Sequence, residues 1–218
     1  MTIFFYLAVL LSQSKKKAIF AVGLMILAFF FHKSAIVLAP MLLMRDKAIK
    51  HSQYPIYFGG AILISFVLII LSDSLGGFVS SMMNDQFEGY SAYMEGEGAY
   101  ISLSFFNILN MSIIYFLLGT NIYALTKKLN RFEYIAIKLS CVFYMIQVVP
   151  SIGVSARFMY YMLFPFMIGC ATVVRTLKPS FRTAYIFCII IISFLSIRAL
   201  MQSPFFISTY AIYNSILF

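Results

Sequence analysis

Charged residues are scarce in this sequence. They make up 11% of its 218 residues, whereas 62% are hydrophobic and the mean hydropathy is +0.95. Because so few polar side chains cannot cover a globule of this size, the composition excludes a water-soluble protein. The long apolar runs also lack the alternation of polar and apolar positions that a membrane β-barrel needs. We therefore expect an all-α, polytopic helical integral membrane protein.

The sequence also lacks the signatures of several common chemistries. Its three cysteines, Cys141, Cys170 and Cys188, stand singly inside apolar runs, without a CxxC pair or neighbouring ligands. We therefore expect neither a disulfide nor a metal site. No GxGxxG, Walker A, HExxH, GxSxG or Asp-x-Asp motif is present. This absence argues against soluble-type nucleotide chemistry, and we expect no cofactor.

Acidic residues are few, and their distribution indicates the topology. The chain has 7 acidic and 16 basic residues, a net charge of +9. The basic residues form short clusters at 45–50, 127–131 and 175–182, where they mark cytoplasmic loops rather than a nucleic-acid site. Segment 73–100 holds five acidic residues and no Lys or Arg. We therefore expect this segment to be an external loop.

Five apolar runs are long enough to cross a bilayer as helices, which takes roughly 20 residues each. They are 54–72, 101–125, 132–149, 158–174 and 183–201. We expect one transmembrane domain, 1–218, with about six to eight membrane segments. The first apolar run, 2–12, is short for a span, which predicts that upstream spans of a longer protein are missing.

The stretch 18–44 does not fit a single crossing. A straight helix of this length would reach roughly 40 Å and leave His32 and Lys33 near the bilayer midplane, where a lone charge costs about 2.5–3.5 kcal/mol. We instead expect a hairpin of two short arms, 18–31 and 34–44. His32 and Lys33 would lie at its outward-facing turn, and Pro40 would be tolerated in a broken second arm.

Three basic residues do not fit the cytoplasmic pattern. Lys33, Arg157 and Arg198 fall at the outer ends of membrane segments, where a cation is disfavoured unless an anion compensates it. A lipid diphosphate would be such an anion. Arg157 could bind two of its oxygens with a planar guanidinium, at the start of a helix whose dipole also attracts anions. The alternative is that Arg157 and Arg198 extend to lipid headgroups.

Other candidate site residues lie near the same outer ends. His32 is either a general base near neutral pH or a structural residue that hydrogen-bonds a backbone carbonyl. Tyr160 and Tyr161 offer aromatic faces for sugar rings, or else form an interfacial belt. Among the external acids, Glu95 and Glu97 are the candidate catalytic or cation-binding carboxylates, although they also fit a solvated loop.

Three stretches carry a resemblance to a known family. The first, at 30–40, is an apolar helix followed by His, Lys, Ser and a second apolar run. The second, at 87–93, is a Tyr-rich external segment followed by Gly96 and Gly98. The third, at 156–161, is an Arg with two following Tyr. Their order and spacing resemble those of the EpsG/Wzy-type polysaccharide polymerases, integral membrane enzymes that join O-antigen or capsule repeat units. The resemblance covers nearly the whole chain, but only the C-terminal part of a typical family member.

This resemblance implies an integral-membrane glycosyltransferase fold in the cytoplasmic (inner) membrane of a bacterium, with an outward-facing active site. The donor would be a growing glycan on polyprenyl diphosphate, and the acceptor the terminal sugar of a new lipid-linked unit. Membrane lipids, a chain-length regulator and a flippase would be partners. Arg157 and His32 would be catalytic, supported by Lys33 and Arg198, and sugar rings would be bound by Tyr90, Tyr93, Tyr160 and Tyr161.

Three alternative functions stay open at this point. A flippase for the same lipid-linked sugars would also use membrane cations, although the two halves of the chain show no convincing repeat. An O-antigen ligase-like transferase would share an outer His and Arg. An inactive, truncated polymerase would fit the short first run.

Overall fold

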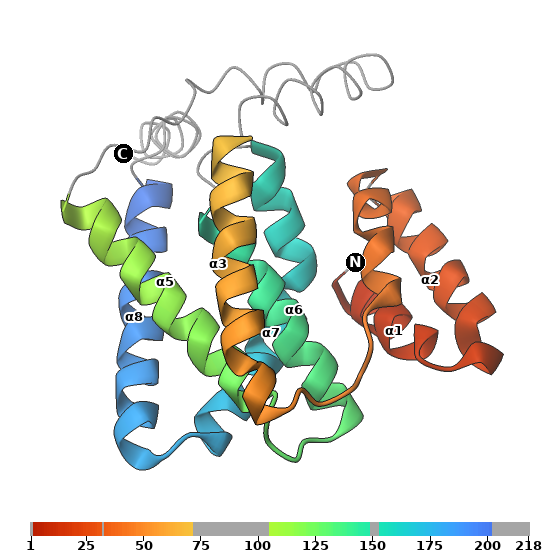
Figure 1. Cartoon of the computed structure of the whole chain (residues 1–218). Helices are drawn as coiled ribbons and strands as arrows, with labels where there is room; N and C mark the ends of the chain where they lie inside the picture. The colour runs from red at the N-terminus through yellow and green to blue at the C-terminus, as the bar shows by residue number, and fades with distance from the viewer. Residues whose placement is uncertain (1, 32, 72–104, 149–152, 202–218) are drawn as a thin grey trace, which may run out of the picture. The chain divides into compact units, whose positions relative to one another are not determined.

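The computed structural model describes residues 2–31, 33–71, 105–148 and 153–201, and within these ranges every regular element is a helix (Figure 1). The all-α prediction is therefore confirmed. The chain forms two compact units, Met1–Leu177 and Lys178–Phe218. The second unit contains α8 (Pro179–Met201), which begins with a proline, a residue that suits the first turn of a helix because its missing N–H has no intrahelical partner there.

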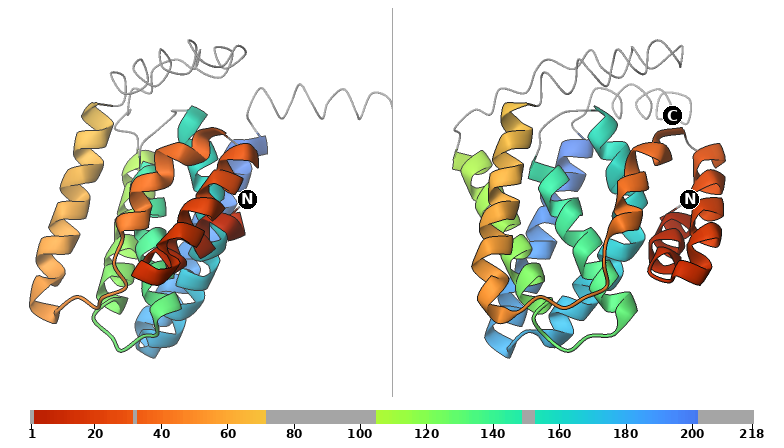
Figure 2. Two further views of the ribbon diagram at one scale, coloured as in Figure 1. Left: turned by 90° about the vertical axis from the view of Figure 1, so that its right-hand side faces the viewer. Right: turned by 45° about the vertical axis from the view of Figure 1, so that its right-hand side comes forward.

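The first unit opens with the hairpin that the sequence predicts. After α1 (Thr2–Ser12) and the short η1 (Lys15–Lys17), α2 (Ala18–Phe31) forms one arm and η2 (Lys33–Leu43) returns as the other. The two arms pack against each other and against α1 (Figure 2). The second arm, which was expected to be broken around Pro40, is a 3₁₀-helix that contains this proline.

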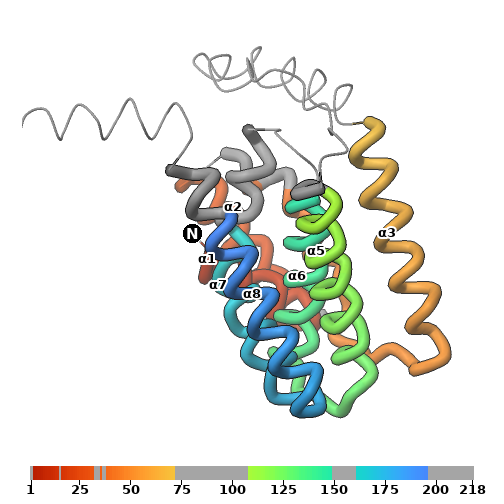
Figure 3. Tube along the Cα trace, turned by 90° about the vertical axis from the view of Figure 1, so that its left-hand side faces the viewer, coloured from red at the N-terminus to blue at the C-terminus, as the bar shows by residue number. Residues whose placement is uncertain are grey.

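Four longer helices follow in the described part of the first unit. They are α3 (Tyr54–Ile70), α5 (Phe105–Ala124), α6 (Arg131–Val148) and α7 (Gly153–Thr176). The helix α6 packs against both α5 and α7, and α3 lies at the edge of this group against α5 and α6 (Figure 3). These helices coincide with four of the five predicted spans, but α7 begins five residues before the predicted start at 158.

The first unit has two distinct ends. Its loops 13–17, 44–53 and 125–130 meet at one end, since Gln13 bonds to Met44 and the Ile49 N–H donates to the Leu125 carbonyl at 3.3 Å. We call this the basic end. The opposite, distal end holds the last residues of α2, α3 and α6 and the first residues of η2, α5 and α7. This up-and-down order agrees with the predicted placement of the basic clusters on one side.

The apolar core of the first unit joins the hairpin to α6 and α7. Phe5 and Val9 of α1, Ala28 of α2, and Ile135 and Leu139 of α6 are among its fully buried members. Where α6 crosses α7, small residues allow a close approach: a Cβ on Gly169 would lie 2.1 Å from the Ser140 hydroxyl oxygen. Small side chains at such crossings are typical of helices that associate in membranes.

Many large apolar side chains face outward instead of into this core. Seven of the exposed ones belong to α3, among them Leu63 and Ile70 at 65% and 77% exposure. By length and apolar composition, one helical stretch of the described residues, His51–Ile70, could cross a membrane, and five other apolar helices are shorter. The predicted number of spans therefore stays a prediction, while the apolar exterior is that of a helical membrane protein.

Candidate functional site

The predicted site residues fall into two groups in the structure. His32, Tyr90, Tyr93, Glu95 and Glu97 lie outside the described residues. The others lie in described helices: Lys33 begins η2, Arg157, Tyr160 and Tyr161 follow the first turn of α7, and Arg198 is in the last turn of α8, within the second unit.

Two of the predicted cationic positions share the distal end of the first unit. The elements η2 and α7 pack against each other, and Ala35 of η2 lies in the same core cluster as Met162 of α7. Lys33 precedes Ala35 by two residues, and Arg157 precedes Met162 by five. The fold therefore brings the backbone positions of Lys33 and Arg157 to one end, away from the other basic residues of this unit.

The early start of α7 changes one part of the reasoning about Arg157. The sequence placed this residue immediately before a helix at 158, whereas the helix begins at Gly153. Because the attraction of a helix N-terminus for anions falls off within its first turn, Arg157 lies beyond the position where the dipole contributes most. Its guanidinium charge, not the helix end, would have to provide any attraction for a diphosphate.

Tyr161 lies in the apolar core. Its ring is fully buried and meets Phe5 edge-on, with 6.1 Å between the ring centroids. In this conformation Tyr161 helps to pack α7 against α1, and its ring is not open to a sugar. Its predicted role in substrate binding stays a prediction.

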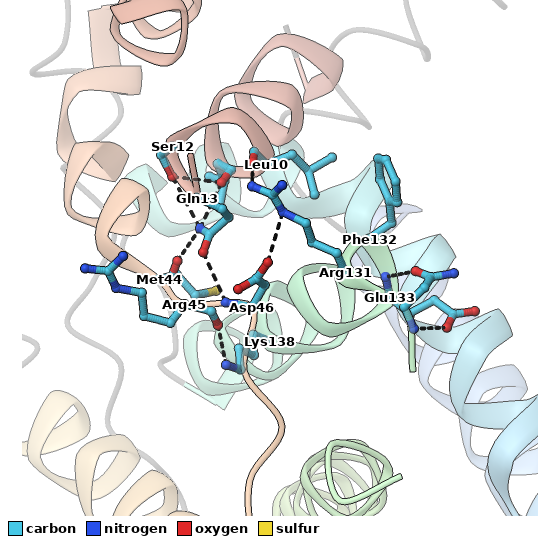
Figure 4. Close-up of polar contacts among 12 residues, drawn as sticks. Leu10, Ser12, Gln13, Met44, Arg45, Asp46, Arg131, Phe132, Glu133 and Lys138 are labelled. Atoms are coloured by element: carbon cyan, nitrogen blue, oxygen red, sulfur yellow. Dashed lines mark hydrogen bonds and ion pairs between the residues drawn. The ribbon is translucent and has the colours of Figure 1, made fainter. Parts of the chain in front are cut away.

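The contacts with the clearest geometry lie at the basic end, where a salt bridge links α6 to the segment after the hairpin (Figure 4). Arg131 Nε lies 2.9 Å from Asp46 Oδ2, and the same guanidinium donates to the Leu10 carbonyl at 2.7 Å. Leu10 is in the last turn of α1, where carbonyls lack helical partners and a cation is favourable. The side chains of Arg131 and Asp46 are 42% and 31% exposed, so water screens the pair and limits it to about 1 kcal/mol.

Two polar side chains at the end of α1 bind the returning arm of the hairpin. The Ser12 hydroxyl donates to the Leu42 carbonyl at 2.7 Å. The Gln13 amide donates to the Met44 carbonyl and accepts from the Asp46 N–H at 3.1 Å. Together these bonds attach the end of the returning arm to the end of α1 at the basic end (Figure 4).

The start of α6 is fixed by a capping box. The Asn130 side chain accepts from the Glu133 N–H at 2.9 Å, and the Glu133 carboxylate accepts from the Asn130 N–H at the same distance. Glu133 also pairs with Arg175 in the last turn of α7, at 2.5 Å. Arg175, the first residue of the predicted cluster 175–182, thus pairs with the first turn of α6, directly after the cluster 127–131.

Lys138 is a residue that the sequence reasoning missed. It lies two turns inside α6, within a predicted span, and its ammonium donates to the backbone carbonyls of Arg45 and, at 2.9 Å, Lys47. A charged side chain inside an apolar run is costly unless it is paired, and such residues are often functional. The sequence does contain a signal for Lys138: it is a lysine at the seventh position of the apolar run that starts at 132.

These observations define the class of protein. The chain is a helical protein with a membrane-type apolar exterior, and the polar contacts described above gather at one end of its first unit. The model of the EpsG family matches residues 1–215, and the chain therefore belongs to the EpsG family. Membership implies a membrane protein with a polysaccharide polymerase-type role in general. Neither the curated proteins nor the solved structures gave a match.

Proposed function

We propose that this chain polymerises polyprenyl-diphosphate-linked oligosaccharide units into O-antigen, capsule or exopolysaccharide at the outer face of a bacterial cytoplasmic membrane. The observation that carries this proposal is the family match over residues 1–215. The backbone positions of Lys33 and Arg157 at the distal end of the first unit, opposite the basic end, also support it. A substrate at that end would meet cations that the positive-inside rule does not account for.

The proposed reaction is a glycosyl transfer. A hydroxyl oxygen of the acceptor sugar attacks the anomeric carbon of the donor glycan, and the bond from that carbon to the diphosphate oxygen breaks. The acceptor proton passes to His32, and the electron pair of the broken bond leaves with the polyprenyl diphosphate. Because negative charge develops on the leaving group, Arg157 would stabilise the transition state, with Lys33 and Arg198 in support.

Complementation of a polymerase-deleted strain tests this function. The full gene, including any natural upstream coding region, is expressed and the glycan ladder is read on a gel. We expect a multi-unit ladder from the natural protein and single-unit glycan from Arg157→Ala at equal protein level. Arg45→Ala is the matched control, because Arg45 is an exposed arginine at the basic end, and we expect it to leave the ladder unchanged.

The outcomes separate polymerisation from the alternatives. A ladder of normal length from Arg157→Ala would overturn the role of this residue. A natural protein that gives no ladder, but restores transfer of lipid-linked units across the membrane, would indicate a flippase. Attachment of finished glycan to a lipid core without chain extension would indicate a ligase-like transferase, and no effect on any of these steps would indicate an inactive chain.

A further inference from the structure

An apolar groove of about 370 Å³ lies between α3, α5, α6 and the segment after the hairpin. This volume falls within the roughly 300–1,000 Å³ that small-molecule sites usually have. Its lining is apolar apart from the Lys138 ammonium and the Tyr57 hydroxyl, and the segment after the hairpin contributes Met44 and Ile49 to it.

The groove starts near the basic end and runs along the helices. On α6 its lining extends from Lys138 to Met145, and on α3 from Ile56 to Ile64. At a rise of 1.5 Å per residue, these spans correspond to about 10–12 Å. One leaflet contributes roughly 15 Å to the hydrocarbon core of a bilayer. The groove therefore matches most of the depth of the leaflet on the side of the basic end.

Positive charge is concentrated where the groove approaches the basic end. The Lys138 ammonium uses two donors on the carbonyls of Arg45 and Lys47 and has a third available. Segment 44–50 crosses this end of the groove, and within it the Lys47 and Lys50 side chains are exposed. Among the described residues that line the groove, Lys138 is the only charged one. This end of the groove is therefore suited to an anionic group.

From this arrangement we infer that the groove binds one anionic phospholipid from the leaflet at the basic end. An acyl chain occupies the groove, and the phosphate lies at Lys138, Lys47 and Lys50. Basic pockets between membrane helices on the cytoplasmic side bind anionic headgroups in this way. A peptide suits the groove poorly, because the apolar lining would leave its N–H and C=O groups without partners, whereas an acyl chain brings no polar groups. This inference depends on the placement of the chain in a membrane, not on polymerase activity.

Two adjacent glycines on α3 provide a matched pair of variants. An added Cβ would meet no atom within 4 Å at either Gly59 or Gly60, but only Gly60 lines the groove. Gly60→Leu should therefore fill the groove without distorting the helix, and Gly59→Leu should leave the groove open. The full chain in detergent is titrated with phosphatidylglycerol or phosphatidylcholine, and bound lipid is counted by native mass spectrometry.

We expect the natural chain to retain phosphatidylglycerol in preference to phosphatidylcholine. Gly60→Leu should weaken retention about tenfold, the loss that follows when roughly two methylenes leave an apolar site, while Gly59→Leu should bind normally. The double variant Lys47→Gln/Lys50→Gln should reduce the preference for phosphatidylglycerol roughly thirtyfold, at about one kcal/mol for each lysine removed. The exposed pair Lys16→Gln/Lys17→Gln, next to the α1–α2 turn, is its control and should leave the preference intact.

Three results would overturn the inference. Equal retention of the two phospholipids by the natural chain would remove the anionic specificity. Normal binding by Gly60→Leu, or equal loss in Gly59→Leu, would remove the groove as the site. Displacement of phosphatidylglycerol by substoichiometric polyprenyl monophosphate would assign the groove to the isoprenoid carrier instead. None of these results depends on the glycan ladder, so this inference and the proposed function can fail separately.

Discussion

The crossing of α6 and α7 at Gly169 leads to a prediction about stability in which another helical glycine, Gly59, serves as the reference. An added Cβ on Gly169 would lie 2.1 Å from the Ser140 hydroxyl oxygen and 3.1 Å from the Ala136 carbonyl oxygen. The first distance is impossible without movement of Ser140. That movement would disturb its buried bond to the Ala136 carbonyl, at 2.8 Å. The backbone carbonyl cannot move aside as a side chain can, so α6 and α7 must separate slightly.

The expected magnitude comes from a comparison of two Gly→Ala changes. Each change gains about 0.8–1.0 kcal/mol of helix propensity, so this contribution cancels when Gly169→Ala is compared with Gly59→Ala, where the added Cβ meets open space. The remaining difference is the cost of overpacking, about 1–3 kcal/mol. We therefore expect Gly169→Ala to be less stable than Gly59→Ala by that amount.

The assay is unfolding of the purified full chain in mixed micelles, followed by far-UV circular dichroism as the fraction of denaturing detergent rises. The variant Gly119→Ala should fall between the other two, because its nearest neighbours are the ring of Phe58 at 3.1 Å and the hydroxyl of Tyr54 at 3.2 Å, which are side-chain atoms that can shift. Replacing Ser140 by Gly in the Gly169→Ala background should restore part of the loss. Equal stability of the Gly59 and Gly169 variants would refute this account of the crossing.

Three further predictions concern the basic end. Tyr6→Phe removes a 2.8 Å bond to the carbonyl of the second residue of α6 and should lower stability by about 1 kcal/mol in the same unfolding assay; no change would mean that water replaces the bond. A double-mutant cycle on Arg131→Gln and Asp46→Asn should give a coupling below about 1 kcal/mol that decreases with salt, and a larger, salt-independent value would contradict the partial exposure of the pair. Lys138→Met removes two bonds to backbone carbonyls, so amide hydrogen exchange measured by mass spectrometry should rise in 44–50 and stay unchanged in α5.

The hairpin could be predicted because ionisable residues in an apolar stretch indicate it. A histidine and a lysine interrupt an apolar stretch that is too long for one crossing, and the cost of burying a charge at the midplane requires a turn there. The form of the second arm was not predictable. Hydropathy is the same for an α-helix and a 3₁₀-helix, and in the fold this arm is held by contacts with α1 and α7 that are distant in sequence.

In the candidate site, too, some features could be predicted from the sequence and others could not. Charge patterning identified Lys33 and Arg157 as unusual, and packing of η2 on α7 places both at the distal end. The burial of Tyr161 against Phe5 could not be foreseen, because an interfacial tyrosine and a core tyrosine are identical in sequence. Lys138 was overlooked for a different reason: the positive-inside rule was applied to loops, whereas this side chain reaches from within a helix to backbone carbonyls near the basic end.

The position of the polar contacts affects how the Arg157 test should be interpreted. The described salt bridges and the bonds from Gln13 and Lys138 fix α1, segment 44–50, α6 and α7 relative to one another, and all of them lie at the basic end. Around Tyr161, the distal half of this unit is packed by apolar side chains. Substituting Arg157 removes none of these described contacts. A loss of polymer in Arg157→Ala, at unchanged protein level and with the unfolding midpoint of the natural chain in mixed micelles, would therefore indicate a missing interaction with the substrate rather than a disrupted bundle.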